Sequence, residues 1–232
     1  MDRDAIIEQG KSELFRNGHT EFDSDTLEYW ADEGPKWLSR KHPELWFWKT
    51  IDITTFASMA ASTTQLDMPA DFNVMIHLWD LTNDKELERR ELDDIRADYG
   101  ASWSAGNTIA FYEAGSADVG GGDIRARFGL FRPLNQITDL EVCYYRHPTA
   151  MATGASAPDL PIHFHDFCVQ FLVNRGAWFI EDDNLAKSSW MQVYDFIKQI
   201  GKQHQRRVKR KNWIGERRSS RIVRSAGRRY NY

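Results

Sequence analysis

The hydrophobic residues of this chain change their spacing twice, and this change constrains the fold more than any other feature. They recur at helical spacing near both ends, over residues 4–16, 24–42, 159–180 and from Asp183 onward. Between these segments, apolar and polar residues alternate as in half-buried strands. A chain that runs helices, strands and helices is best explained by a bundle built from both ends. We therefore predict an α+β fold: a helical bundle formed by the N- and C-terminal helices, an inserted antiparallel, sandwich-like β-rich region and an extended basic C-terminal tail.

This pattern divides the chain into four regions. The N-terminal helices take residues 1–45, the β-rich insertion residues 46–149, the C-terminal helices residues 158–204 and the basic arm residues 205–232. A small-residue linker, Ala150–Ala157, precedes the C-terminal helices. Within the insertion we expect strands at 46–53, 73–79, 108–112, 124–130 and 140–144. The charged residues 84–99 predict a short helix that ends at Gly100, and Gly115–Gly122 predicts a flexible hairpin tip.

Charge is divided very unevenly along the chain. The last 31 residues hold twelve of the thirty Lys and Arg residues and a single acid, Glu216. The remaining 201 residues hold eighteen basic and thirty-three acidic residues, so an acidic body carries a strongly basic arm. Such an arm is suited to an anionic partner, whether nucleic acid, a membrane surface or an acidic face on a partner protein, including another copy of the chain. No segment approaches the ~20 apolar residues that span a bilayer, and no secretory signal follows Met1, so we expect no membrane partner.

Aromatic and apolar residues are interleaved with the basic residues of the arm. An arm that binds only nucleic acid does not need them, so we interpret part of it as docking in a protein groove. If extended, the 21 residues from Asn212 would span about 70 Å. A disordered, solubilising tail is the alternative. The docking residues that we predict are Arg206, Arg207, Lys209, Arg210, Lys211, Trp213, Arg217, Arg218, Arg221, Arg224, Arg228, Arg229 and Tyr230.

Residues with catalytic or metal-binding chemistry are present, but their pattern does not predict an enzyme. His163 and His165, with Asp166 beside them and His147 upstream, form a His-x-His pattern. They begin a helix, where positions i and i+2 do not face each other, so a metal site is disfavoured. The carboxylates at residues 23–33 and 181–183 suit a solvated surface better than a glycosidase pair. We expect no cofactor, no metal and buried, reduced thiols at Cys143 and Cys168.

Five motifs, in this order, resemble those of the head-to-tail adaptor (connector) proteins of tailed bacteriophages. They cover roughly residues 4–200, while the long Arg-rich arm exceeds the simplest family pattern. The motifs are the start of the second helix at residues 23–30, His42-Pro43-Glu44-Leu45, the turn at residues 66–72, Tyr144-Tyr145-Arg146-His147-Pro148, and Leu160-Pro161 with His165 and residues 171–177.

The resemblance implies a non-enzymatic virion protein of the neck, made in the host cytoplasm. Adaptors of this kind form a ring of about twelve subunits beneath the portal. The ring extends the DNA channel, retains the packaged genome and provides a docking platform for the tail. The implied partners are the portal protein, other copies of the chain, tail or nozzle proteins, and the double-stranded DNA in the channel. The alternative function is a nucleic-acid-binding protein that grips DNA with its basic arm.

Overall fold

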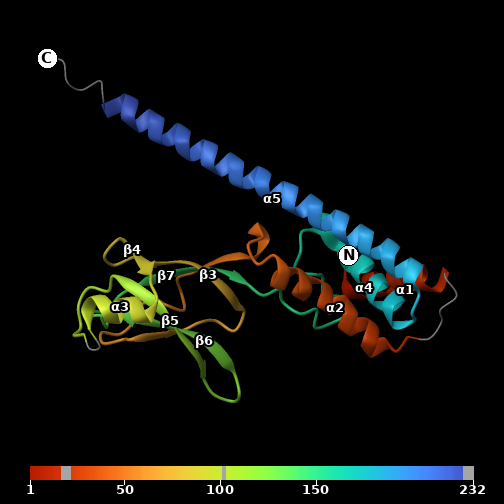
Figure 1. Cartoon of the computed structure of the whole chain (residues 1–232), viewed down its shortest axis with the longest axis horizontal. Helices are drawn as coiled ribbons and strands as arrows, with labels where there is room; N and C mark the ends of the chain where they lie inside the picture. Colours follow the sequence, from red (N-terminus) through yellow and green to blue (C-terminus); the bar gives the residue numbers. More distant parts are fainter. Residues whose placement is uncertain (17–21, 101–102, 227–232) are drawn as a thin grey trace. The chain divides into compact units, whose positions relative to one another are not determined.

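The computed structural model (Figure 1) describes residues 1–16, 22–100 and 103–226, with side chains as far as Arg206 apart from that of Arg16. The chain forms two compact units. One, the helical unit, combines Met1–Pro35 with Ala150–Tyr232; the other, the β unit, is Lys36–Thr149. Both helices and a sheet are present, so the fold is α+β, as predicted.

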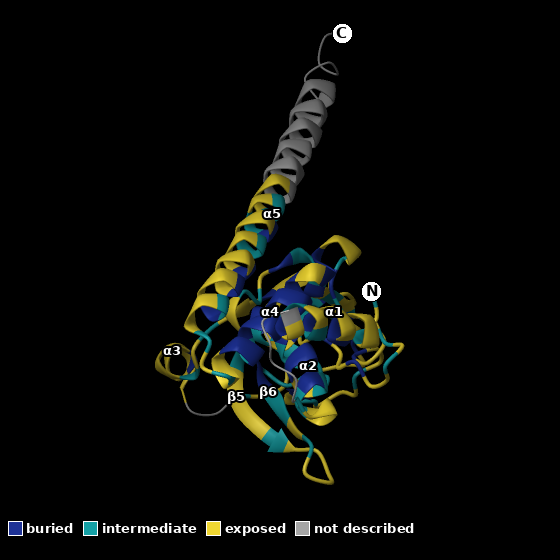
Figure 2. Cartoon of the chain, turned by 90° about the vertical axis from the view of Figure 1, so that its right-hand side faces the viewer, coloured by how far each residue is buried: buried dark blue, intermediate teal, exposed yellow. Residues whose placement is uncertain are grey.

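The helical unit is arranged around one buried helix. Its helices are α1 (Arg3–Arg16), the first part of α2 (Ser24–Lys41), α4 (His165–Phe179) and α5 (Asp183–Ala226), with a 3₁₀ turn at Ile162–Phe164 before α4. Helix α4 packs against α1 and α5, and Arg175 of α4 pairs with Glu33 of α2 at 3.0 Å. Most residues of α4 are therefore buried, which makes it dark blue in Figure 2.

Two glycines allow α1 and α4 to approach closely. A Cβ atom at Gly176 of α4 would lie 2.7 Å from Leu14 Cδ1 of α1. A Cβ atom at Gly10 of α1 would lie 2.6 Å from Leu172 Cδ2 of α4. Each leucine thus occupies the space that the glycine of the other helix leaves open, and both leucines are fully buried. Close packing of this kind tolerates little added volume.

The segment that we expected to be a linker is held against the start of α1. The amide of Arg3 donates to Ser156 O at 2.9 Å, and that of Asp4 donates to Gly154 O at 3.1 Å. The amide of Met151 donates to Asp32 Oδ1 of α2 at 2.9 Å. The first two bonds satisfy amides of the first turn of α1, which have no partner within the helix. Residues 151–156 are therefore an ordered part of the helical unit.

The β unit contains a seven-stranded sheet with the order β1-β7-β3-β4-β5-β6-β2. The strands expected at 73–79, 108–112, 124–130 and 140–144 are confirmed as β3, β5, β6 and β7, and residues 46–53 form a 3₁₀ turn followed by β1. The bounds are Lys49–Asp52 (β1), Gln65–Asp67 (β2), Phe72–Asp80 (β3), Lys85–Arg89 (β4), Ala110–Asp118 (β5), Ile124–Phe131 (β6) and Leu140–Arg146 (β7).

Two details of the predicted insertion are wrong. The sheet is a single mixed sheet and not an antiparallel sandwich, because β4 pairs with β5 in parallel. Parallel neighbours need a crossover connection, and α3 (Leu92–Tyr99) lies within it. The charged segment 84–99 is accordingly a strand followed by a helix, not one helix. The helix ends at Gly100 as predicted, where the backbone φ of +82° suits glycine.

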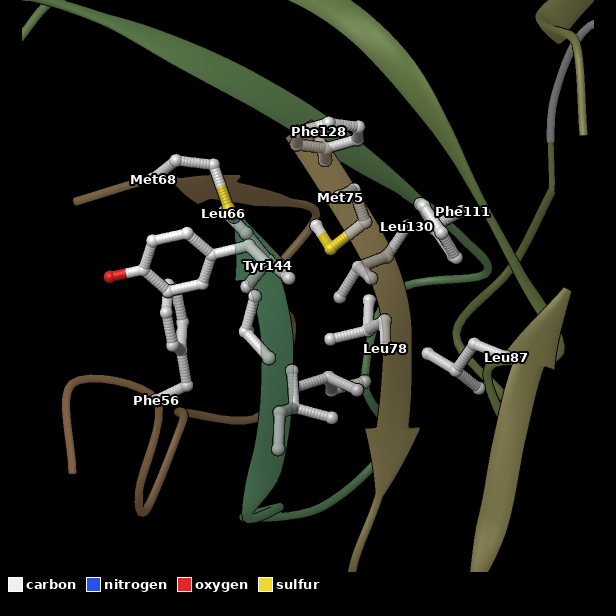
Figure 3. Close-up of a cluster of buried hydrophobic side chains, with 13 residues drawn as sticks. Phe56, Leu66, Met68, Met75, Leu78, Leu87, Phe111, Phe128, Leu130 and Tyr144 are labelled. Carbon is white, nitrogen blue, oxygen red and sulfur yellow. The ribbon is translucent and has the colours of Figure 1, made fainter. Parts of the chain in front are cut away.

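One face of the sheet buries the hydrophobic cluster shown in Figure 3. The cluster contains Leu78 of β3, Leu87 of β4, Phe111 of β5 and Tyr144 of β7, and all four side chains are nearly inaccessible to solvent. The alternation of apolar and polar residues predicted this face, because every second residue of a strand points to the same side. The cluster draws on strands from across the sheet and holds the β unit together.

The C-terminal arm differs from the prediction. Instead of an extended chain from Asn212, helix α5 continues as far as Ala226. Its sequence explains this, since Lys, Arg, Gln and Ala favour helices and no proline occurs in α5. At about 1.5 Å per residue, the stretch from Asn212 to Ala226 rises only about 20 Å. The arm therefore reaches less far, and more rigidly, than an extended chain would.

We predict that Gly176→Val destabilises the protein by about 1–3 kcal/mol, because the new side chain meets fully buried Leu14. The same substitution at Gly201 of α5 is the matched control, since no atom lies within 4 Å of a Cβ atom there. We expect it to change the stability by less than about 0.5 kcal/mol. Urea denaturation followed by circular dichroism measures both, and equal effects would contradict the close-packing account.

Candidate docking surfaces

The docking residues that the sequence predicts are carried mainly by one helix. Arg206 lies on α5 with its side chain exposed. Arg228, Arg229 and Tyr230 lie outside the described residues. The other nine lie on the backbone of α5 and are Arg207, Lys209, Arg210, Lys211, Trp213, Arg217, Arg218, Arg221 and Arg224. Cations are favourable toward the C-terminal end of a helix, where the backbone carbonyls are unpaired.

Helix α5 is fixed to the helical unit by the residues that precede the arm. Ala186, Val193 and Ile200 are buried, and the side-chain amide of Asn174 donates to Ala186 O at 2.8 Å. Farther along, the side chains of His163 and Gln203 are 3.3 Å apart. The anchored part of α5 thus extends to about Gln203, and the basic arm follows it on the same helix.

The turn between α4 and α5 carries a second candidate surface, which the sequence reasoning missed. Trp178 and Phe179 end α4 with 61% and 67% of their surface exposed. Exposed Glu181 and Asp183 follow within four residues. We call these four residues the α4–α5 tip. The sequence patterns considered above gave Trp178 and Phe179 no role, although an adjacent Trp and Phe before the acidic run 181–183 could have indicated this surface.

Backbone and ring contacts hold this tip in one conformation. The amide of Asp182 donates to Ala177 O at 3.0 Å, and Asp182 Oδ1 accepts the amide of Leu185 at 3.0 Å, which caps α5. The ring of Phe179 lies 5.7 Å from that of Trp30 and 6.1 Å from that of Phe22. The exposed aromatic surface is therefore organised before any partner binds.

Three carboxylates of α2 that lie in the cluster considered above for glycoside hydrolysis have structural partners. Glu28 pairs with Arg3 at 3.0 Å and Glu33 pairs with Arg175 at 3.0 Å. Asp32 accepts the amide of Met151. These contacts tie α2 to α1, α4 and residues 151–156. They account for the positions of the three side chains without any catalytic role.

The three histidines of the metal hypothesis lie in different environments. His163 is exposed, whereas His165 is buried with Nε2 2.9 Å from Leu160 O. Burial lowers the pKa of His147, and the charge of Arg40 lowers it further, while Asp71 acts in the opposite direction. No group of three potential metal ligands occurs among the residues that the structure describes.

Two further findings concern the surface of the described chain. A hollow of about 390 Å³ lies between β3, β4 and β5. Two polar side chains that line it have partners outside the hollow, since His77 lies 3.3 Å from Glu141 and Arg89 pairs with Glu113. Within residues 1–16, 22–100 and 103–226, no helix is long and apolar enough to cross a bilayer.

Comparison with known proteins identifies a family for this chain. The model of the SU10 adaptor protein family matches residues 2–223, which is nearly the whole chain. No curated protein matches the chain. The match includes the α4–α5 tip and most of the basic arm, so both candidate surfaces lie in the part of the chain that the family model describes.

We predict that His147 makes the folded protein sensitive to mild acid. Its lowered pKa means that protonation favours the unfolded chain, in which a histidine titrates near about 6.5. The stabilisation is complete above that pH and is lost as the pH falls through the folded-state pKa. Between pH 7.5 and 5.5, the urea midpoint of the wild type should therefore fall more than that of His147→Gln. An equal fall of the urea midpoint in the two proteins would contradict the role of His147 in this pH dependence.

Proposed function

The chain belongs to the SU10 adaptor protein family, and on that premise we propose that it is a structural virion protein that joins the head of a tailed bacteriophage to its tail. The match over residues 2–223 is the observation that carries this proposal. The described architecture agrees with it, since helices from both ends of the chain pack together and a β unit is inserted between them. The partners are the portal protein, tail or nozzle proteins and other copies of the chain.

In the neck, about twelve copies form a ring beneath the portal. The ring lengthens the DNA channel, retains the packaged genome and gives the tail a platform. The charge distribution supports this role, because residues 1–201 carry a large excess of acids. A channel wall with the same sign of charge as DNA repels the duplex and lets it pass without sticking.

The basic arm makes the contact that attaches each subunit. Arg206 and the basic and aromatic residues that follow it reach a portal subunit or a neighbouring adaptor. A few anchors that become desolvated at the interface, such as Trp213 and Tyr230, supply most of the affinity, and the surrounding charges supply orientation and speed of association. The helical backbone of α5 supports this proposal, because residues already in a helix lose less conformational entropy on docking than an extended chain.

Removal of residues 206–232 should leave the body folded and abolish attachment to the portal. Among the side chains that the structure describes, the buried anchors of α5 are Ala186, Ser189, Val193 and Ile200, and these precede the truncation. Native mass spectrometry of the full chain mixed with the portal protein should show a portal-bound ring, and the truncated chain should show none. Thermal unfolding of the two chains serves as the control for folding. Normal assembly by the truncated chain would refute the role of the arm.

The charge of the arm also favours a second function, in which it grips DNA directly. This alternative predicts that the free chain binds a duplex tightly and that affinity falls steeply as salt rises. Gel-shift titration of a duplex probe at two salt concentrations measures it. No portal complex together with a strong, salt-sensitive shift would favour the DNA-binding function over the adaptor.

A further inference from the structure

We propose that the α4–α5 tip is the receptor for the basic arm of a second copy of this chain. The inference rests on the proposed ring and names the surfaces that join neighbouring subunits. Trp178, Phe179, Glu181 and Asp183 form one side of the contact. The arm after Gln205 forms the other, with eleven Lys and Arg residues, a single acid and the aromatic residues Trp213, Tyr230 and Tyr232.

The first argument is the exposure of the aromatic pair. Trp178 and Phe179 are consecutive, and more than half of each side chain is open to solvent. The same helix buries its other aromatic residues, Phe167 and Phe171, almost completely. An exposed Trp-Phe pair on a hydrogen-bonded turn is typical of a protein-binding surface, because large aromatic side chains supply most of the energy at interface centres.

The second argument is chemical complementarity. Glu181 and Asp183 follow the aromatic pair within four residues and are exposed. Lys187 approaches Asp183 at 3.8 Å, in an exposed i,i+4 pair. Asp182 is occupied as the cap of α5. Arginine binds both features, since its guanidinium stacks on aromatic faces and pairs with carboxylates. The tip thus suits an Arg-rich segment with apolar residues, which is the composition of the arm.

The third argument excludes the arm of the same chain. The tip lies at the start of α5 and the arm at its end, and the helix between them is continuous from Asp183 to Ala226. With a rise of about 1.5 Å per residue, Arg206 lies about 35 Å from Asp183 and Ala226 about 65 Å away. A continuous helix cannot bend back onto its own first turn, so the arm that fills the tip belongs to another molecule.

The contact is head to tail, because different surfaces of the two copies meet. Contacts of this type generate closed rings when the rotation between successive copies divides a full turn. Each copy in such a ring contributes one arm and one tip, so every tip is filled. Helix α5 then sets the spacing between neighbours, and its length links the two surfaces.

The test uses a synthetic, fluorescein-labelled peptide of residues 205–232 and the purified full-length chain. Fluorescence anisotropy should show saturable binding that weakens as salt rises. Trp178→Ala and Glu181→Gln, made separately, should each weaken it at least fivefold and together at least twentyfold. Tyr194→Ala, which removes another exposed aromatic side chain of α5, and Asp94→Asn, which removes an exposed carboxylate of α3, are matched controls that should leave the affinity unchanged.

Absence of saturable binding would overturn the proposal, as would equal affinity in the tip variants and the controls. Unlabelled arms of other copies compete with the peptide more strongly at an intact tip than at a weakened one, so the measured ratios between the variants and the wild type are lower limits. Circular dichroism confirms that the variants fold, and Glu181→Gln keeps the aromatic packing of Phe179 intact. Portal binding is measured on the same proteins. If the wild type and the two controls bind the peptide but not the portal, the result counts against the role in the neck. The arm–tip contact is then still supported.

Discussion

Burial of α4 among α1, α2 and α5 is the interaction on which the helical unit depends. The close approach at Gly176 and Leu14 fixes α1, the pairing of Arg175 with Glu33 fixes α2, and the bond from Asn174 to Ala186 O fixes α5. This packing against α4 determines the position of helix α5 in the helical unit. The exposed tip spans the end of α4 and the first residue of α5, and the last turns of α5 carry the basic arm, so a single buried helix positions both candidate surfaces.

Local patterns of the sequence predicted most of the elements. The periodicity of Leu14 and Leu27 indicated helices, and the alternation around Phe128 and Leu130 indicated a strand, because each pattern reflects one buried face. The parallel pairing of β4 and β5 was missed because it joins residues that a helix separates. Pairing between distant segments leaves no periodic signal, and β4 itself had been predicted as part of a helix, so an antiparallel sandwich was the wrong extrapolation.

The two candidate surfaces differ in how far sequence could reveal them. The arm was visible as a run of charge, which needs no tertiary information, although the helical backbone beyond Lys211 was not foreseen. The tip was missed because Trp178 and Phe179 stand at the end of an expected helix, where spacing alone does not distinguish an exposed aromatic residue from a buried one. Only the packing of α4 shows that its last turn extends past its neighbours, where an aromatic side chain is exposed and not buried.

The location of the chain in the intact particle tests the central claim most directly. Cryo-electron microscopy of purified virions, with symmetry imposed only along the tail axis, should resolve the helical unit between the portal and the tail. The account predicts one ring of copies there, with each α5 directed toward a neighbour or the portal. Density for this chain in the capsid shell or at the distal end of the tail, or no copies in the particle, would contradict it.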